Sequence, residues 1–254
     1  MFFLRGRRRK KLLQTPLAPA AREVLYRSAP LCAAVPRNLR ARHEGVTQVI
    51  LQEKHFEGAG GLALTDEMRL AIAGQAALLQ LRESAEHYPG LDTVLVYPDA
   101  FVVPLQETDD DGYLVHDAPD ERAGESWQRG VVVVSWRDAS RESRRRDGYN
   151  LVLHEFAHQL DELTGEADGT PPLDHDLNQR WADVFQSAFE QHQRNLRRRR
   201  PVLYDDNAAE SPCEFFATTI ELFFEYPADL HREFPGVYHL VSTYLELDPA
   251  AWTA

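Results

Sequence analysis

The sequence predicts an α+β fold that is mostly helical and carries one small sheet. Apolar residues recur at helical spacing over residues 65–86, 177–196 and 211–226, which predicts three long helices. The β-branched run Val131–Ser135, flanked by turn-forming residues, predicts a strand. A chain of 254 residues can bury a substantial core.

Composition narrows the functional class. The formal net charge of −12 argues against a general nucleic-acid binder and favours solubility. Cys32 and Cys213 are too few for a disulfide framework, which indicates a reducing compartment. The sequence contains no evident secretion signal and no apolar run of the roughly 18 residues that a membrane span requires. We therefore predict a cytoplasmic protein without a membrane span.

Two parts of the chain differ in character. Residues 1–20 are basic, and we expect a solvated, flexible tail, with contact to acidic lipid as the alternative. Residues 21–254 are expected to form a single domain, helical to about residue 90. Two short helices are predicted between residues 21 and 54, and Thr65 is a plausible N-cap of the next helix.

The middle of the chain mixes strands and loops. Short strands are predicted at Val94–Tyr97 and Phe101–Val103, with an acidic turn at residues 109–112. Residues 137–148 are interpreted as a polar connection. A helix is then expected from Asn150 to about residue 163, where glycines and prolines end it.

Two helices and a shorter one are predicted in the last third. Trp181, Phe185 and Phe189 share one face of the first, and we expect this face to pack inward. The following run 197–200 is basic and is interpreted as a solvated helix end, with phosphate binding as the alternative. A last helix is expected over residues 237–247.

The second of these helices begins with a capping box. Ser211 is the expected N-cap, Pro212 the first helical residue and Glu214 the third. This pattern predicts a helix that runs to about Tyr226.

The segment His154-Glu155-Phe156-Ala157-His158 carries the chemistry. On a helix, residues four apart lie one turn above each other, so His154 and His158 can direct imidazole nitrogens at one metal ion. Tetrahedral zinc suits such ligands and keeps a fourth position for water in catalytic sites. Glu155 can take the proton of that water as a general base.

The apolar surroundings of this motif strengthen the interpretation. Three polar groups inside a buried helix are costly without partners, although a satisfied pair of core histidines is the alternative. Asp161 lies on the same face, where it could hydrogen-bond a ligand histidine or be a solvated carboxylate. A third ligand must come from elsewhere. Glu214 and Glu221 both qualify, and their spacing does not choose between them.

Residues 148–161 and 211–217, together with residues 62–69 and 133–136, resemble the Mlc titration factor A family of bacterial zinc-dependent peptidases. The resemblance extends from about residue 20 to 245. The His-Glu-Phe-x-His and Glu-Phe-Phe-Ala segments are also similar to those of anthrax lethal factor. In that pattern the glutamate of the second segment is the third zinc ligand. The resemblance therefore implies Glu214 and leaves Glu221 outside the ligand set.

The resemblance also implies a zincin-like fold, in which the strand Val131–Ser135 borders the cleft and could pair with an extended substrate. It implies peptidase or aminopeptidase-like activity on peptides, and binding to a transcriptional repressor of sugar uptake. Relatives often carry a tyrosine where Asn207 stands here, so Tyr204 is the substitute candidate for stabilising the oxyanion. The alternative functions are a regulatory protein that sequesters the repressor and a zinc hydrolase with non-peptide substrates.

Overall fold

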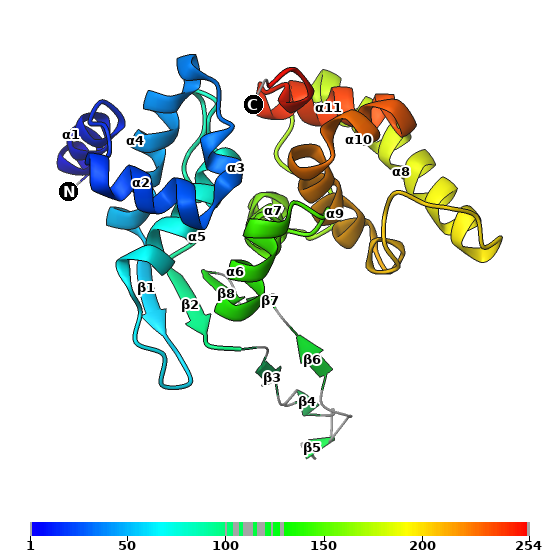
Figure 1. Cartoon of the computed structure of the whole chain (residues 1–254). Helices are drawn as coiled ribbons and strands as arrows, with labels where there is room; N and C mark the ends of the chain where they lie inside the picture. Colours follow the sequence, from blue (N-terminus) through cyan, green and yellow to red (C-terminus); the bar gives the residue numbers. More distant parts are fainter. Residues whose placement is uncertain are drawn as a thin grey trace.

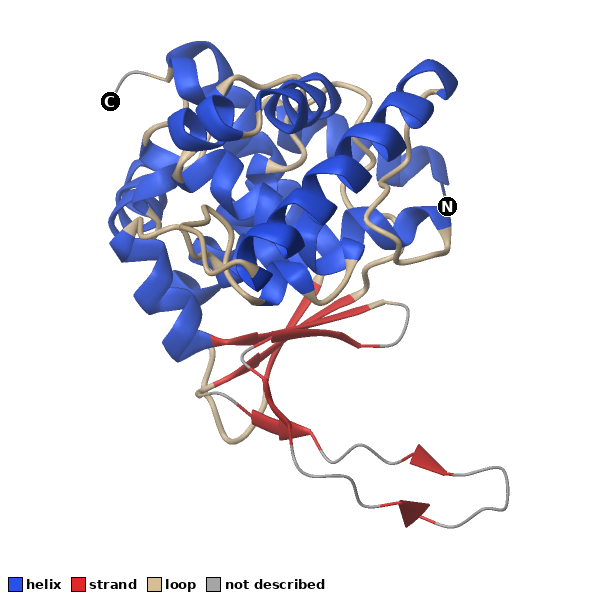
Figure 2. Cartoon of the chain, turned by 90° about the vertical axis from the view of Figure 1, so that its right-hand side faces the viewer, coloured by secondary structure: helices blue, strands red, loops and turns tan. Residues whose placement is uncertain are grey.

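A computed structural model describes residues 2–99 and 130–252, and between these ranges only the strand residues 101–103, 107–108, 114–115, 120–122 and 124–127. Most of the described residues are helical, and a small sheet lies at one side of the helices, as Figures 1 and 2 show. The predicted α+β class is confirmed.

The basic N-terminal segment is a helix, not the flexible tail that its composition predicts. Helix α1 (Phe2–Leu13) packs against helix α4 (Arg37–Glu53). The Arg9 guanidinium forms a salt bridge of 2.5 Å with the Glu53 carboxylate. Composition alone predicts that these basic side chains are solvated. In the structure, the salt bridge of Arg9 instead joins two helices.

The helices of the N-terminal part follow their proline and cap signals. Pro30 begins one helix and Pro36 is the N-cap of the next, so three helices occupy a region for which two were predicted. The Thr65 side chain accepts a hydrogen bond from the Met68 backbone, as expected of an N-cap. The helix that follows ends at Leu78 and not near residue 86. The bounds are α2 (Pro19–Ser28), α3 (Pro30–Ala33) and α5 (Asp66–Leu78).

The main sheet has four strands in the order β1-β2-β8-β7: His55–Gly58, Thr93–Tyr97, Val131–Ser135 and Gly124–Trp127. The first three run parallel, and β7 pairs antiparallel with β8. Strand β8 is the predicted valine strand. Because it has a neighbour on each side, its backbone is already paired, so the expectation that β8 itself pairs with substrate is wrong. Strand β7 forms that edge of the sheet.

Two further antiparallel pairs lie away from the helices (Figure 2). They are β3 (Phe101–Val103) with β6 (Asp120–Arg122), and β4 (Glu107–Thr108) with β5 (Leu114–Val115). The predicted acidic turn at residues 109–112 lies outside the described residues.

The segment predicted as a polar connection is mostly helix α6 (Trp136–Arg145). The Ser135 side chain caps it by accepting a hydrogen bond from the Asp138 backbone at 3.3 Å. One face of α6 buries Ala139 and Ser143. The many charged residues of this segment make its helical pattern hard to recognise in the sequence.

The remaining helices are α7 (Leu151–Asp161), α8 (His175–Arg197), α9 (Pro212–Glu225), α10 (Pro227–Glu233) and α11 (Pro235–Leu245), with short 3-10 turns at Glu162–Thr164, Asn207–Ala209 and Pro249–Ala251.

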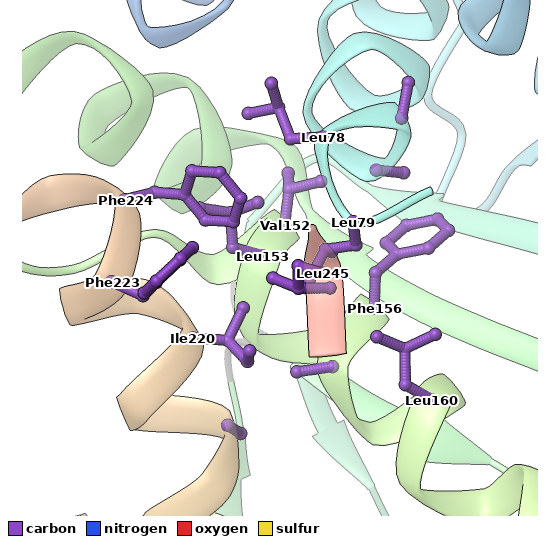
Figure 3. Packing of buried hydrophobic residues seen from close by; sticks show 14 of the residues in the cluster. Leu78, Leu79, Val152, Leu153, Phe156, Leu160, Ile220, Phe223, Phe224 and Leu245 are labelled. Carbon is purple, nitrogen blue, oxygen red and sulfur yellow. The ribbon is translucent and has the colours of Figure 1, made fainter. Parts of the chain in front are cut away.

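Helix α7 lies at the centre of the hydrophobic core. Figure 1 shows it between the N-terminal helices and the group α8–α11, and it packs against α5, α9 and strand β8. Val152, Phe156 and Leu160 of α7 belong to the same buried hydrophobic cluster as Leu78 of α5 and Ile220 of α9, as Figure 3 shows. Burial on all these sides holds α7 rigidly.

No helix in the described part of the chain is long and apolar enough to cross a membrane.

Candidate metal centre

The start of helix α7 is fixed by side chains that satisfy its free backbone donors. The Asn150 side chain accepts a hydrogen bond from the Leu153 backbone at 3.1 Å. The Leu151 backbone donates to Glu142 at 2.9 Å, and the Asn150 backbone donates to Glu221. Helices leave their first N–H groups unpaired, so these acceptors stabilise the turn from which the motif begins.

The start of helix α9 is fixed in a similar way. The Ser211 hydroxyl accepts a hydrogen bond from the Glu214 backbone at 3.1 Å, which confirms the predicted N-cap. Gly169 (φ +82°) packs so closely that an added Cβ would lie 2.5 Å from the Pro212 carbonyl oxygen. The Gly169 carbonyl accepts a hydrogen bond from the Trp181 indole at 3.0 Å. The loop before α8 therefore holds the first turn of α9 in place.

These two helices bring His154, His158 and Glu214 together. One potential ligand atom from each lies within 4.8 Å of the others. The Nε2 atoms of the two histidines are 3.2 Å apart. A Glu214 oxygen lies 3.1 Å from Nε2 of His154, and the other lies 3.4 Å from Nε2 of His158.

This arrangement fits zinc. Ligand atoms at about 2.1 Å from a tetrahedral ion are about 3.4 Å from one another, close to the separations above. In neutral His154, Nδ1 must carry the hydrogen because it faces the Glu221 carboxylate, so Nε2 presents its lone pair to the other two groups. Nitrogen and carboxylate donors converging in this way suit a cation or a shared proton.

Glu221 lies behind His154 and not among the three converging groups. Its Oε1 accepts the Nδ1 hydrogen of His154 at 2.8 Å, and its Oε2 accepts the Asn150 backbone N–H. A carboxylate in this position orients a ligand histidine and selects its tautomer. The spacing of Glu214 and Glu221 does not choose between them as ligands. In the structure, only Glu214 lies with the Nε2 atoms of the two histidines.

His158 is held by a different group. Its Nδ1 lies 3.0 Å from Sγ of Cys213, and Cys213 shares a hydrogen bond with the Asp161 carboxylate. Asp161 also accepts the backbone N–H groups of Gly169 and Thr170, each at 2.8 Å. The prediction that Asp161 hydrogen-bonds a ligand histidine is therefore wrong as a direct contact, because Cys213 lies between the two residues.

In the metal-free protein the two histidines differ in charge. Burial disfavours the charged form of His154, but hydrogen bonds with Glu214 and Glu221 outweigh it and raise the pKa of His154 well above its usual value. Burial, followed by the charge of His154, lowers the pKa of His158 to about 4. One proton is therefore held at His154, and a cation that binds there displaces it.

Glu155 and the exposure of the three groups complete the site. Glu155 follows His154 on α7 and is 3% exposed. The side chains of His154 and Glu214 are 17% and 29% exposed, so solvent reaches the point where the three groups converge. A site with an open side and a buried carboxylate on the same helix suits catalysis better than a closed structural site.

Tyr204 and Asn207 lie apart from these contacts. Tyr204 is buried, stacks on Phe215 with ring centroids 4.4 Å apart, and hydrogen-bonds Thr219 at 3.0 Å. Asn207 is exposed in a 3-10 turn. The contacts of Tyr204 are those of a core residue, and the hydroxyl expected to face an oxyanion is already engaged.

Several residues of the site have weak sequence signals. Cys213 could have been noticed because it directly precedes Glu214 in the first turn of α9. Glu225 follows Glu221 by one turn, and its carboxylate accepts a hydrogen bond from the Asn150 side chain at 3.2 Å. Glu142 lies in α6, where nothing in the sequence links it to the motif.

Comparison with known proteins assigns the chain to a family. Residues 3–245 match the family model described as glucose-regulated metallo-peptidase M90. An uncharacterized protein of Synechocystis is 40% identical over 245 residues, covering 95% of this chain and 89% of its own. Mlc titration factor A of Serratia proteamaculans is 35% identical, covering 87% and 85% of the two chains, and that of Yersinia pestis is 33% identical, covering 87% and 83%. The chain therefore belongs to the M90 metallopeptidase family and is similar to the Mlc titration factor A proteins over most of its length.

Proposed function

We propose that this protein is a zinc-dependent peptidase in which His154, His158 and Glu214 hold the metal and Glu155 is the general base. The convergence of three donor atoms within 4.8 Å carries the proposal. A zinc ion bound there would supply Lewis-acid activation of a water molecule. Membership of a metallopeptidase family supports the same assignment.

The protein residues divide the remaining work. Glu155 accepts the proton of the attacking water and returns it to the leaving amine. Its burial supports this role, because bulk solvent has little access to the carboxylate. Glu221 holds the ring of His154, so the ligand does not rotate while the proton moves.

Replacement of Glu155 by glutamine tests the proposal. The variant keeps the size of the side chain but cannot accept the proton, so peptide hydrolysis should fall by at least about 10²-fold. Zinc content, measured by elemental analysis of the purified protein, should stay unchanged. Full activity in Glu155→Gln would contradict the proposed role. An exposed carboxylate on the approach to α9 offers the matched control, Glu210→Gln, which should behave as the wild type.

Strand β7 is the proposed guide for an extended substrate. It forms the edge of the sheet next to β8, and helix α7 packs against both strands. An edge strand offers unpaired backbone groups to a peptide in extended conformation. Aminopeptidase-like specificity is a finer proposal. It predicts that acetylation of a peptide's N-terminus abolishes cleavage, whereas an endopeptidase would cleave both forms.

The second candidate function is regulatory binding, and the name Mlc titration factor A of the relatives favours it. In this reading the protein sequesters a transcriptional repressor of sugar uptake in the cytoplasm, and hydrolysis is secondary. Titration calorimetry with the purified repressor separates the two functions. Binding that is the same for the wild type and Glu155→Gln would make regulation independent of catalysis, and no binding would remove this candidate.

A further inference from the structure

The two histidines of the site are held from behind by different chemistry. His154 faces a carboxylate, Glu221, at 2.8 Å. His158 faces a thiol, with Nδ1 3.0 Å from Sγ of Cys213. Ligand histidines usually donate their second ring N–H to a carboxylate, a backbone carbonyl or water. The thiol therefore occupies a position where a stronger acceptor is the rule.

The hydrogens in this contact can be assigned from the acceptors around it. When Nε2 of His158 faces a cation, Nδ1 carries the hydrogen and donates it to Sγ. The thiol hydrogen is then free to be donated to the Asp161 carboxylate, with which Cys213 shares a hydrogen bond. His158 donates to Cys213 and Cys213 donates to Asp161, which only accepts, so no donor opposes another.

Asp161 makes this line rigid. Its side chain is fully buried, and its two oxygens accept the backbone N–H groups of Gly169 and Thr170 at 2.8 Å. Gly169 in turn packs on the Pro212 carbonyl, one residue before Cys213. The carboxylate is thus anchored to the same loop that fixes the start of α9, and it cannot follow His158 if that ring turns.

We propose that Cys213 is a positioning residue for His158, which relays the orienting effect of the anchored Asp161 carboxylate to the ligand ring. This inference rests on the proposed zinc site. Cys213 takes no part in proton transfer or metal ligation. Its contribution is to keep Nε2 of His158 directed at the point where Nε2 of His154 and the Glu214 carboxylate meet.

Two substitutions of equal size separate hydrogen bonding from packing. Cys213→Ala and Cys213→Ser remove the same volume, but serine keeps a hydroxyl that can accept from His158 and donate to Asp161. The zinc dissociation constant of each full-length protein is measured by competition with a chromophoric chelator. The thermal midpoint of the metal-free protein reports packing, and the absorption spectrum of the cobalt-substituted protein reports ligand geometry.

The expected result is a zinc affinity about 10- to 100-fold weaker in Cys213→Ala, with Cys213→Ser within about threefold of the wild type. Both metal-free variants should lose thermal stability because both lose the volume of the sulfur atom, and only Cys213→Ala should change the cobalt spectrum. Equal affinities in the two variants, whether weakened or not, would overturn the inference. A wild type that binds no zinc would overturn both this inference and the proposed function. A serine–alanine difference in a protein without peptidase activity would support the inference and reject the function.

Discussion

The burial of Glu225 predicts how the stability of the folded protein depends on pH. Its side chain is fully buried at the end of α9, where Asn150 donates to one oxygen and the Arg146 guanidinium lies 3.7 Å from the other. Burial, together with the charges of Glu221 and Asp147, raises the pKa of Glu225 to about 7, although Asn150 and Arg146 oppose the rise. The folded protein therefore binds a proton at Glu225 over a range of pH in which the unfolded chain has released it.

The sign follows from this difference in proton binding. Between the unfolded pKa of 4.5 and the folded value of about 7, the native state holds more protons, so the free energy of unfolding decreases as pH rises. At about 1.4 kcal/mol for each pH unit, this decrease amounts to about 3 kcal/mol as an upper limit. Glu225→Gln mimics the protonated form at every pH, so the variant should not show this decrease in the free energy of unfolding.

Urea unfolding of the metal-free wild type and Glu225→Gln, followed by circular dichroism, measures the effect. The two proteins should be similar near pH 5, and the variant should be more stable by up to about 3 kcal/mol near pH 8. Glu210→Gln, at an exposed position, should follow the wild type at both pH values. Parallel pH dependence in the wild type and Glu225→Gln would show that Glu225 does not take up a proton on folding.

Three further substitutions test other parts of the structure. Glu221→Gln can accept only one of the two N–H groups that the carboxylate accepts, so zinc affinity in a chelator competition should fall about 10- to 100-fold, mainly through His154. Gly169→Ala forces a side chain into a left-handed conformation against a carbonyl and should cost about 1–3 kcal/mol in urea unfolding. Tyr204→Phe loses the hydrogen bond to Thr219 and should cost about 1 kcal/mol, with little change in kcat for a peptide substrate.

Each of these has an outcome that would count against it. Wild-type zinc affinity in Glu221→Gln would mean that the carboxylate does not orient the ligand. Unchanged stability in Gly169→Ala would show that the loop can move away from α9. A loss of about 10²-fold in kcat for Tyr204→Phe would return that residue to the role of oxyanion donor.

The fold could be predicted where local signals decide the structure. Thr65 and Ser211 cap their helices as expected, and the valine strand Val131–Ser135 has its predicted bounds. Local signals fail where a distant partner decides. Helix α1 depends on the pairing of Arg9 with Glu53, which lie 44 residues apart. The position of β8 inside the sheet depends on pairing between strands, which no single segment reveals.

The candidate site divides in the same way. The spacing of His154 and His158 predicts their convergence, because both lie on one helix. The choice of Glu214 needed the family resemblance, since Glu221 lies two turns along the same helix. Cys213 could not be predicted as the group behind His158, because that contact depends on how α9 packs against α7.

X-ray absorption at the zinc edge measures whether His154, His158 and Glu214 hold a zinc ion. We expect one zinc ion per chain, with two imidazole nitrogens and oxygen ligands at about 2.0–2.2 Å and no sulfur. Glu214→Ala should lower zinc affinity and change the oxygen contribution to the spectrum. A sulfur ligand at about 2.3 Å would place Cys213 on the metal, and a protein purified without chelators that contains no zinc would contradict the assignment of His154, His158 and Glu214.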